Sequence, residues 1–160
     1  MDIGYKAGVA SIKAQKPKLV YLLGADEDLI TRKDMNPNES FIIYQGHHGD
    51  KGAEMADVVL PGAAYTEKNA TYVNTEGRAQ QARLVVAPPG KAKEDWKILR
   101  ALSDVLGNPL PYNDAGELNA RMAEVSPTLT QLDVLESANF IKSNIELQVL
   151  NQKFNFQILS

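Results

Sequence analysis

Lys18-Leu-Val-Tyr-Leu-Leu23 is a short, nearly continuous apolar run, and Gly24-Ala25-Asp26 follows it directly. Such a run is typical of a strand that is buried inside a parallel sheet. Two similar runs, Phe41-Ile-Ile-Tyr44 and Asp57-Val-Val-Leu60, come later in the chain. Because parallel neighbours need long crossover connections, these spacings predict an α/β fold with a small parallel sheet. In such sheets the functional loops follow the carboxyl ends of the strands.

Helices are expected on either side of these strands. Residues 4–15 carry apolar residues at helical spacing, and Pro17 ends that helix. Residues 50–56 predict a second, short helix. Three strands alone leave two exposed sheet edges, which isolated proteins avoid. We therefore expect further segments to complete this sheet.

The chain changes character after the third strand. The segment from Tyr72 to Gln81 predicts a β-hairpin, in which Gly77 takes the positive φ angle that the turn requires. Val85 and Val86 predict a further short strand, which Pro88-Pro89-Gly90 ends.

The clearest helix signal covers residues 92–106. Acidic residues lie in its first turn, where they interact favourably with the helix dipole. Gly107 and Pro109 end the helix, and residues 114–124 predict another. One apolar stripe runs along the first of these helices and is formed by Trp96, Leu99, Leu102 and Leu106.

The composition changes after about residue 112. Residues 101–160 hold three basic and seven acidic residues, and neither glycine nor proline occurs after Pro127. We therefore divide the chain into an α/β domain at 1–112 and a helical C-terminal extension at 113–160. Apolar residues at helical spacing within 141–158, alongside many Asn and Gln residues, predict a tail that packs on a neighbouring domain or subunit.

The overall composition excludes several classes of protein. The 160 residues are 44% hydrophobic and 23% charged, and the formal net charge of −3 gives no reason to expect a nucleic-acid partner. No apolar run reaches about 18 residues, so we expect no direct membrane insertion. Cysteine is absent, which excludes thiolate ligands for zinc or iron–sulfur clusters and a cysteine nucleophile.

His47 and His48 are the only histidines. Adjacent residues on an extended segment point in opposite directions, so the pair would chelate a metal poorly. A metal site here would need other ligands, of which Asp50 and Glu54 are nearest in sequence. The alternative is a polar loop whose imidazoles bond to the backbone.

Gly46, Gly49 and Gly52 follow the second strand at regular spacing. This pattern could cradle a phosphate at a helix N-terminus, but the neighbouring Asp50 would repel one. Turn geometry is the simpler explanation for the three glycines.

Glu67, Lys68, Glu76 and Arg78 surround the predicted hairpin. A buried carboxylate–arginine pair could take part in catalysis, but such groups more often hold a loop through charge-assisted hydrogen bonds. Trp96 is interpreted as a core anchor. From the residues alone we assign no catalytic, cofactor-binding or metal-binding residue.

Four sequence blocks nevertheless occur in an order that resembles the molybdopterin oxidoreductase superfamily. The resemblance implies a partial Rossmann-like parallel sheet with a hairpin excursion and a helical C-terminal extension. The blocks are Ala56-Asp-Val-Val-Leu-Pro61, Glu67-Lys-Asn-Ala-Thr-Tyr-Val-Asn-Thr-Glu-Gly-Arg-Ala-Gln80, Pro88-Pro-Gly90 and Asp95-Trp-Lys-Ile98.

The details resemble one branch, the large iron–sulfur subunit of respiratory complex I (NADH:ubiquinone oxidoreductase), in its mitochondrial form. The similarity is to the C-terminal region of that subunit and is strong over about residues 18–127. It rests on Tyr44-Gln-Gly-His-His-Gly-Asp50, Leu60-Pro-Gly-Ala-Ala-Tyr-Thr-Glu-Lys68, Tyr72-Val-Asn-Thr-Glu-Gly-Arg-Ala-Gln-Gln81 and Glu94-Asp-Trp-Lys-Ile-Leu-Arg-Ala-Leu-Ser103.

The resemblance implies a non-catalytic structural segment. Active relatives carry G-x-N-P after the first strand and Q-D-x-F-x-T-E-T after the second. Here those positions read Gly24-Ala-Asp-Glu27 and Gln45-Gly-His-His-Gly-Asp50, whose acidic residues disfavour a pyrophosphate. The hairpin residues, including Asn74, would brace the domain instead of reacting.

The resemblance also implies partners, cofactors and a location. Iron–sulfur clusters belong to the N-terminal part of the parent subunit, and none is expected in this chain. The implied partners are that N-terminal part and other subunits of the peripheral arm, at the matrix side of the mitochondrial inner membrane. Two alternatives remain: a fragment of a molybdopterin-dependent oxidoreductase that contributes to cofactor binding, and an independent α/β ligand-binding module.

Overall fold

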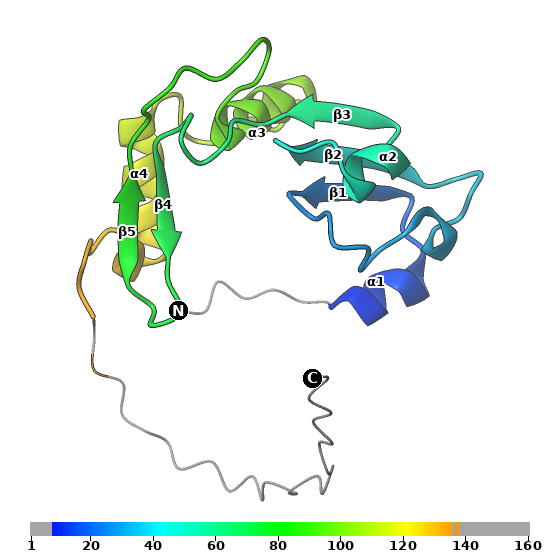
Figure 1. Cartoon of the computed structure of the whole chain (residues 1–160), viewed down its shortest axis with the longest axis horizontal. Coiled ribbons are helices and arrows are strands. Elements are labelled where there is room, and N and C mark those ends of the chain that lie inside the picture. Colours follow the sequence, from blue (N-terminus) through cyan, green and yellow to red (C-terminus); the bar gives the residue numbers. More distant parts are fainter. Residues whose placement is uncertain (1–7, 136, 138–160) are drawn as a thin grey trace, which may run out of the picture.

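The computed structural model describes residues 8–135 and residue 137. Figure 1 shows a three-stranded sheet with two short helices, and a hairpin that lies near two longer helices. The helices are α1 (Val9–Gln15), α2 (Lys51–Met55), α3 (Asp95–Val105) and α4 (Ala115–Val125), with short 3-10 turns η1 (Arg32–Asp34) and η2 (Pro127–Leu129). The strands are β1 (Leu19–Leu23), β2 (Phe41–Gly46), β3 (Val58–Pro61), β4 (Ala70–Val73) and β5 (Ala79–Ala82).

The three predicted apolar runs form a parallel sheet in the order β1-β2-β3, which confirms the predicted fold class. Val20 lies opposite Ile42 and Leu22 opposite Tyr44, so these four side chains share one face. α1 and α2 pack on this face, and Met35 joins it with only 1% of its surface exposed. This face is the hydrophobic core.

The opposite face of the sheet is only partly covered: Gln45 is buried beside Asp95 at the start of α3, but several apolar residues on this face are exposed. Leu19 is 59% exposed, Phe41 45% and Val58 39%, although parallel sheets are normally buried on both faces. The apolar runs predicted the strands correctly, and the exposed apolar residues agree with the expectation that further segments complete this sheet. Within residues 8–135, α1 and α2 pack against the other face.

A charged pair fixes the start of β3. The guanidinium of Arg32 donates to both carboxylate oxygens of Asp57 at 2.9 Å, and the N–H of Ile42 donates to the same carboxylate at 2.8 Å. The Arg32 side chain, and then the Ile42 N–H, hold the pKa of Asp57 below its ordinary value. Asp57 therefore anchors the strand with its side chain, and β3 begins one residue later than predicted.

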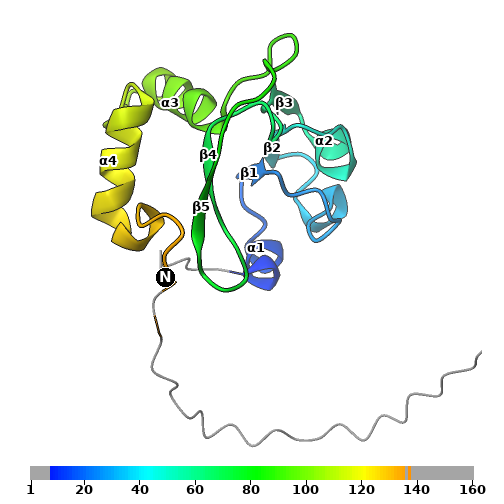
Figure 2. The same cartoon turned by 60° about the vertical axis from the view of Figure 1, so that its left-hand side comes forward.

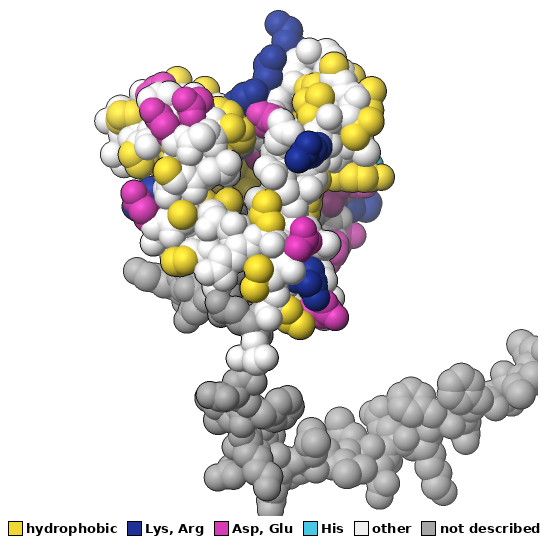
Figure 3. Space-filling view, turned by 90° about the vertical axis from the view of Figure 1, so that its left-hand side faces the viewer, with side chains coloured by type: hydrophobic (Ala, Val, Ile, Leu, Met, Phe, Trp, Pro, Cys, Tyr) yellow, Lys and Arg dark blue, Asp and Glu magenta, His cyan; other side chains and the backbone are white. Residues whose placement is uncertain are grey.

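β4 and β5 form the predicted hairpin, with Tyr72 opposite Gln80. Gly77 has a φ angle of +88°, as the turn requires. The side-chain oxygen of Asn74 accepts hydrogen bonds from the N–H groups of Glu76 and Arg78, both at 3.0 Å. Figures 1 and 2 show α4 alongside this hairpin. Figure 3 shows apolar side chains scattered over this side of the surface.

α3 begins at Asp95 and not at residue 92 as predicted. Lys93 pairs with the end of β3: its N–H donates to Pro61 at 3.1 Å, and its carbonyl accepts from Ala63 at 2.8 Å. This pairing takes Lys93 out of the helix. The helix ends as predicted, with Gly107 at a φ angle of +72°.

The short strand predicted at Val85 and Val86 is wrong. Both N–H groups donate to the carbonyl of Thr66, at 2.9 and 3.2 Å, so a single acceptor serves them both. Val85 is 78% exposed. Val85 and Val86 are apolar, but no edge of another strand pairs with them within residues 8–135, so they do not form a strand.

The helix predicted at 114–124 is confirmed as α4. The carboxylate of Asp114 caps it by accepting a hydrogen bond from the N–H of Glu117 at 2.9 Å. The tail packing predicted for 141–158 and the start of the helix predicted at 4–15 lie outside the described residues. Across the part of the chain that is described, every helix is too short or too polar to cross a bilayer.

Candidate functional site

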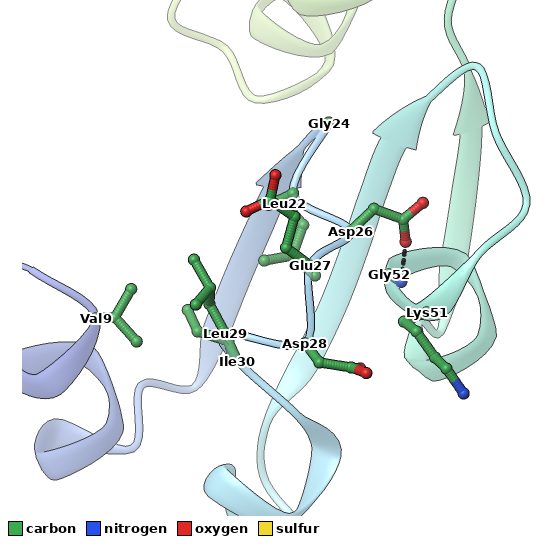
Figure 4. Close-up of a pocket in the computed structure, with 11 residues that line it drawn as sticks. Val9, Leu22, Gly24, Asp26, Glu27, Asp28, Leu29, Ile30, Lys51 and Gly52 are labelled. Atoms are coloured by element: carbon green, nitrogen blue, oxygen red, sulfur yellow. Dashed lines mark hydrogen bonds between the residues drawn. The ribbon is translucent and has the colours of Figure 1, made fainter. Parts of the chain in front are cut away.

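A cavity of about 270 Å³ lies at the carboxyl end of β1, where ligands bind in open α/β sheets. Gly24 and Asp28 have positive φ angles of 60° and 56°, which bend the loop around the cavity. Figure 4 shows apolar side chains from α1 and the loop on one side, with Asp26 and the start of α2 on the other. The lining includes Val9, Leu22, Glu27, Leu29, Ile30 and Lys51.

Asp26 connects this loop to α2. One of its carboxylate oxygens accepts a hydrogen bond from the N–H of Gly52, in the first turn of the helix. The other accepts a hydrogen bond from the hydroxyl of Tyr44 over 3.4 Å. Burial, and then the charges of Asp26 and Asp50, raise the pKa of Tyr44, so the hydroxyl remains a hydrogen-bond donor.

The Asp26 carboxylate thus occupies the place at the helix N-terminus where phosphate-binding α/β folds hold their anion. A phosphate there would lose the Gly52 N–H and would meet the negative charges of Asp26, Glu27 and Asp50. The residues present therefore do not fit a pyrophosphate. We derive no chemical step through a bound cofactor at this loop.

The glycines after β2 are explained by packing against Tyr44. A Cβ atom on Gly52 would lie 2.6 Å from the carbonyl oxygen of Ala25 and 2.6 Å from the Tyr44 ring, and one on Gly46 would lie 2.6 Å from Tyr44 Cζ. Both glycines have ordinary φ angles, and Gly49 faces open space. The explanation by turn geometry is therefore wrong for Gly46 and Gly52.

His47 and His48 lie with their ring centroids 4.2 Å apart and their planes tilted by 46°. The expectation that they point in opposite directions is wrong, because the chain bends at both residues. Asp50 stands at the N-cap position of α2 without a side-chain capping hydrogen bond, and Glu54 pairs with Lys51 at 3.5 Å. Within residues 8–135, no three His, Asp or Glu side chains gather in a way that could hold a metal ion.

A second polar group joins the sheet to α3. The fully buried amide of Gln45 donates to Asp95 over 2.8 Å and accepts a hydrogen bond from the hydroxyl of Tyr21. The other carboxylate oxygen of Asp95 pairs with Lys68. Burial, and then the charge of Asp95, raise the pKa of Tyr21. We call these four residues the Gln45–Asp95 network.

Glu94 ties the same helix to the hairpin. Its carboxylate accepts from the N–H of Asn69 at 3.2 Å and from the Trp96 indole at 3.1 Å, and it pairs with Lys97 at 2.7 Å. Burial raises the pKa of Glu94, but these contacts, with Lys97 foremost, lower it overall. The Trp96 ring packs edge-on against Tyr112 with centroids 6.3 Å apart, but Trp96 is only half-buried and is not part of the hydrophobic core, so the prediction of a core anchor is wrong.

The four charged residues predicted around the hairpin occupy two separate places. Glu67 accepts a backbone hydrogen bond at 3.0 Å, and Lys68 pairs with α3, both ahead of β4. Glu76 and Arg78 lie in the turn and pair at 3.5 Å. Arg78 also donates to the carbonyl of Asp133 at 2.8 Å. Each of these contacts holds a loop or turn in place.

Replacing Arg78 by alanine is expected to lower the free energy of unfolding by about 1–2 kcal/mol, because the Asp133 carbonyl loses a charge-assisted hydrogen bond. The loss should be local, with faster hydrogen exchange around Asp133 and little change in the parallel sheet. Arg83, an exposed arginine after β5, supplies the control, and its alanine variant should unfold like the wild type. Equal effects of the two variants would contradict the bracing role.

Three residues organise the site although the sequence gave no reason to assign them a bracing role. They are Asp26, Gln45 and Asp95. The sequence did hold a signal for Gln45. Its amide continues an apolar strand, so it needs hydrogen-bond partners inside the protein. Asp26 lies in the loop after β1, and only its contact with Gly52 identifies its partner. Asp95 was predicted to favour the helix dipole, whereas its carboxylate bonds across to Gln45 and Lys68.

The amino-acid sequence matches one established family. Residues 1–105 match the family described as molybdopterin oxidoreductase. The mitochondrial 78 kDa subunit of NADH-ubiquinone oxidoreductase from Neurospora crassa is 51% identical over 152 residues, which cover 94% of this chain and 20% of that relative. The corresponding subunit from Candida albicans is 54% identical over 136 residues, which cover 85% of this chain and 18% of that relative.

The fold is also found in a solved structure. Acetylene hydratase from Pelobacter acetylenicus superposes with a TM-score of 0.59 and 19% sequence identity, over 82% of this chain and 21% of that protein. This chain spans about one fifth of the length of the curated relatives it matches. With a family match over residues 1–105 and strong identity to complex I subunits, the chain belongs to the molybdopterin oxidoreductase family.

Proposed function

We propose that this chain is a non-catalytic structural segment of the large iron–sulfur subunit of complex I, which passes electrons from NADH to ubiquinone. The observation that carries the proposal is the Asp26 carboxylate at the N-terminus of α2, which accepts the Gly52 N–H that an anionic ligand would otherwise use. The similarity to NADH-ubiquinone oxidoreductase subunits supports the choice of complex. Both observations favour a family member that keeps the fold without its cofactor.

We further propose that the α/β domain at 1–112 is completed by other segments of the same subunit, and that 113–160 is an extension. The uncovered part of one sheet face, around Leu19, Phe41 and Val58, supports this idea, because a parallel sheet needs cover on both faces. Within residues 8–135, β1 and most of β3 are also open edges with which further strands could pair. Amphipathic helices from the N-terminal part would suit the uncovered part of the face.

The proposal places iron–sulfur clusters in the N-terminal part of the parent subunit, since this chain has no cysteine to hold one. Its partners are that N-terminal part and neighbouring subunits of the peripheral arm. Its location is the matrix side of the mitochondrial inner membrane. We assign no catalytic, cofactor-binding or metal-binding residue to this chain.

Two measurements test the proposal. The tagged full chain, expressed in its native cells, should co-purify with other complex I subunits. The chain purified alone should pass no electrons from NADH to an artificial acceptor, with or without added iron and sulfide. Purification without complex I subunits, or turnover above the buffer blank, would overturn the proposal. A pterin extracted in stoichiometric amount would instead favour the fragment of a molybdopterin-dependent enzyme.

A further inference from the structure

The cavity at the carboxyl end of β1 has the size and lining of a socket for one side chain. Its volume of about 270 Å³ lies just below the range of roughly 300–1,000 Å³ that is usual for small-molecule sites. Its inner wall is apolar and is formed by Leu22 from β1, Val9 from α1 and Ile30 from the loop. Figure 4 shows these groups beside the loop that carries the acidic residues.

The rim of the cavity carries negative charge that the described residues leave unpaired. Glu27 and Asp28 are exposed, and neither forms an ion pair within residues 8–135. Asp26 is engaged by the Gly52 N–H. Lys51 is the one cation in the lining, and its ammonium pairs with Glu54 on the outer surface of α2.

We propose that this cavity receives a lysine or arginine side chain from a neighbouring polypeptide of the assembled complex. The aliphatic stem of that side chain packs on Leu22 and Ile30, and its charged head meets Glu27 and Asp28 at the rim. Long basic side chains bury their stems on apolar surface while the charge stays near water. Charge complementarity at the rim selects a basic partner over an acidic one. The inference rests on the proposed function, because it needs a neighbouring chain.

The test reverses one charge at the rim. Tagged full chain with Glu27→Lys is captured from native cells, and the captured complex is washed at rising ionic strength. We expect its neighbouring polypeptides to dissociate roughly threefold to tenfold faster than from the wild type, because an attractive pair becomes a repulsive one. Glu39→Lys is the matched control, since Glu39 is an equally exposed acid in the loop before β2. That variant should dissociate like the wild type.

Three results would overturn the proposal. The first is equal dissociation of the Glu27→Lys and Glu39→Lys variants. The second is that Glu27→Lys and Lys6→Ala both lower the thermal stability of the purified full chain. The basic group in the cavity would then be Lys6 of the chain itself and not a side chain of a partner. The third is faster dissociation of Glu27→Lys that is independent of salt. Failure of the wild-type chain to capture any complex I subunit is a separate result, which would overturn the proposed function itself.

Discussion

Gly52→Ala is expected to lower the free energy of unfolding by about 2–3 kcal/mol, because the new methyl group has no room. Its Cβ would lie 2.6 Å from both the Ala25 carbonyl oxygen and the Tyr44 ring, and neither neighbour is free to move. Tyr44 is only 2% exposed and belongs to the core, and Ala25 precedes the residue that holds α2. The substitution therefore strains the core and the Asp26 contact together.

Gly49→Ala is the matched control for this prediction. Gly49 lies three residues earlier, in the loop before α2, and a Cβ there would meet nothing within 4 Å. Urea unfolding followed by circular dichroism should give a wild-type midpoint for Gly49→Ala and a clearly lower one for Gly52→Ala. If both variants unfold alike, the glycines are not explained by packing against Tyr44.

Asp95→Ala is expected to have an effect of similar size, about 2–3 kcal/mol, because it leaves two half-buried or buried groups without their partner. The Gln45 amide would lose its acceptor at 2.8 Å and keep only the backbone carbonyl of residue 95 at 3.4 Å. The ammonium of Lys68, whose side chain is 15% exposed, would lose its counter-charge. Since the Gln45–Asp95 network joins the parallel sheet to α3, hydrogen exchange should quicken in both elements.

A double-mutant cycle separates the ion pair from the rest of this loss. Lys68→Ala combined with Asp95→Ala should cost less than the sum of the two single variants. The exposed pair Lys51 and Glu54, with side chains 61% and 74% exposed, serves as the control cycle and should show almost no coupling. A Lys68–Asp95 coupling as small as that of the control would refute the bracing role of the network.

The parallel sheet could be predicted because each strand is a compact apolar run bounded by a turn signal. Residues 41–44 and 57–60 needed no knowledge of their neighbours to be recognised. The start of α3 could not be predicted, since Lys93 leaves the helix only because it pairs with the end of β3. The strand expected at Val85 and Val86 failed for the converse reason, because no edge is available to pair with it.

The candidate site was predictable only in part. The acidic character of the loop after β1 is visible in the sequence, and it disfavours a pyrophosphate there. The contact between Asp26 and Gly52 joins residues that are 26 positions apart, and such a pairing depends on how the strands align. The regular spacing of the glycines suggested turn geometry. Gly46 and Gly52 are instead required by the ring of Tyr44, and the glycine spacing does not show how that ring packs.

The Asp26 carboxylate has a consequence for how the chain responds to its surroundings. Because it is covalently tethered, it meets the Gly52 N–H at an effective concentration of the order of millimolar or above, which a dissolved anion must outcompete. A protein whose fold relies on a dissociable cofactor loses stability when the supply of that cofactor falls. This segment carries its anion within its own chain. The contact between Asp26 and the first turn of α2 therefore forms without any dissolved anion.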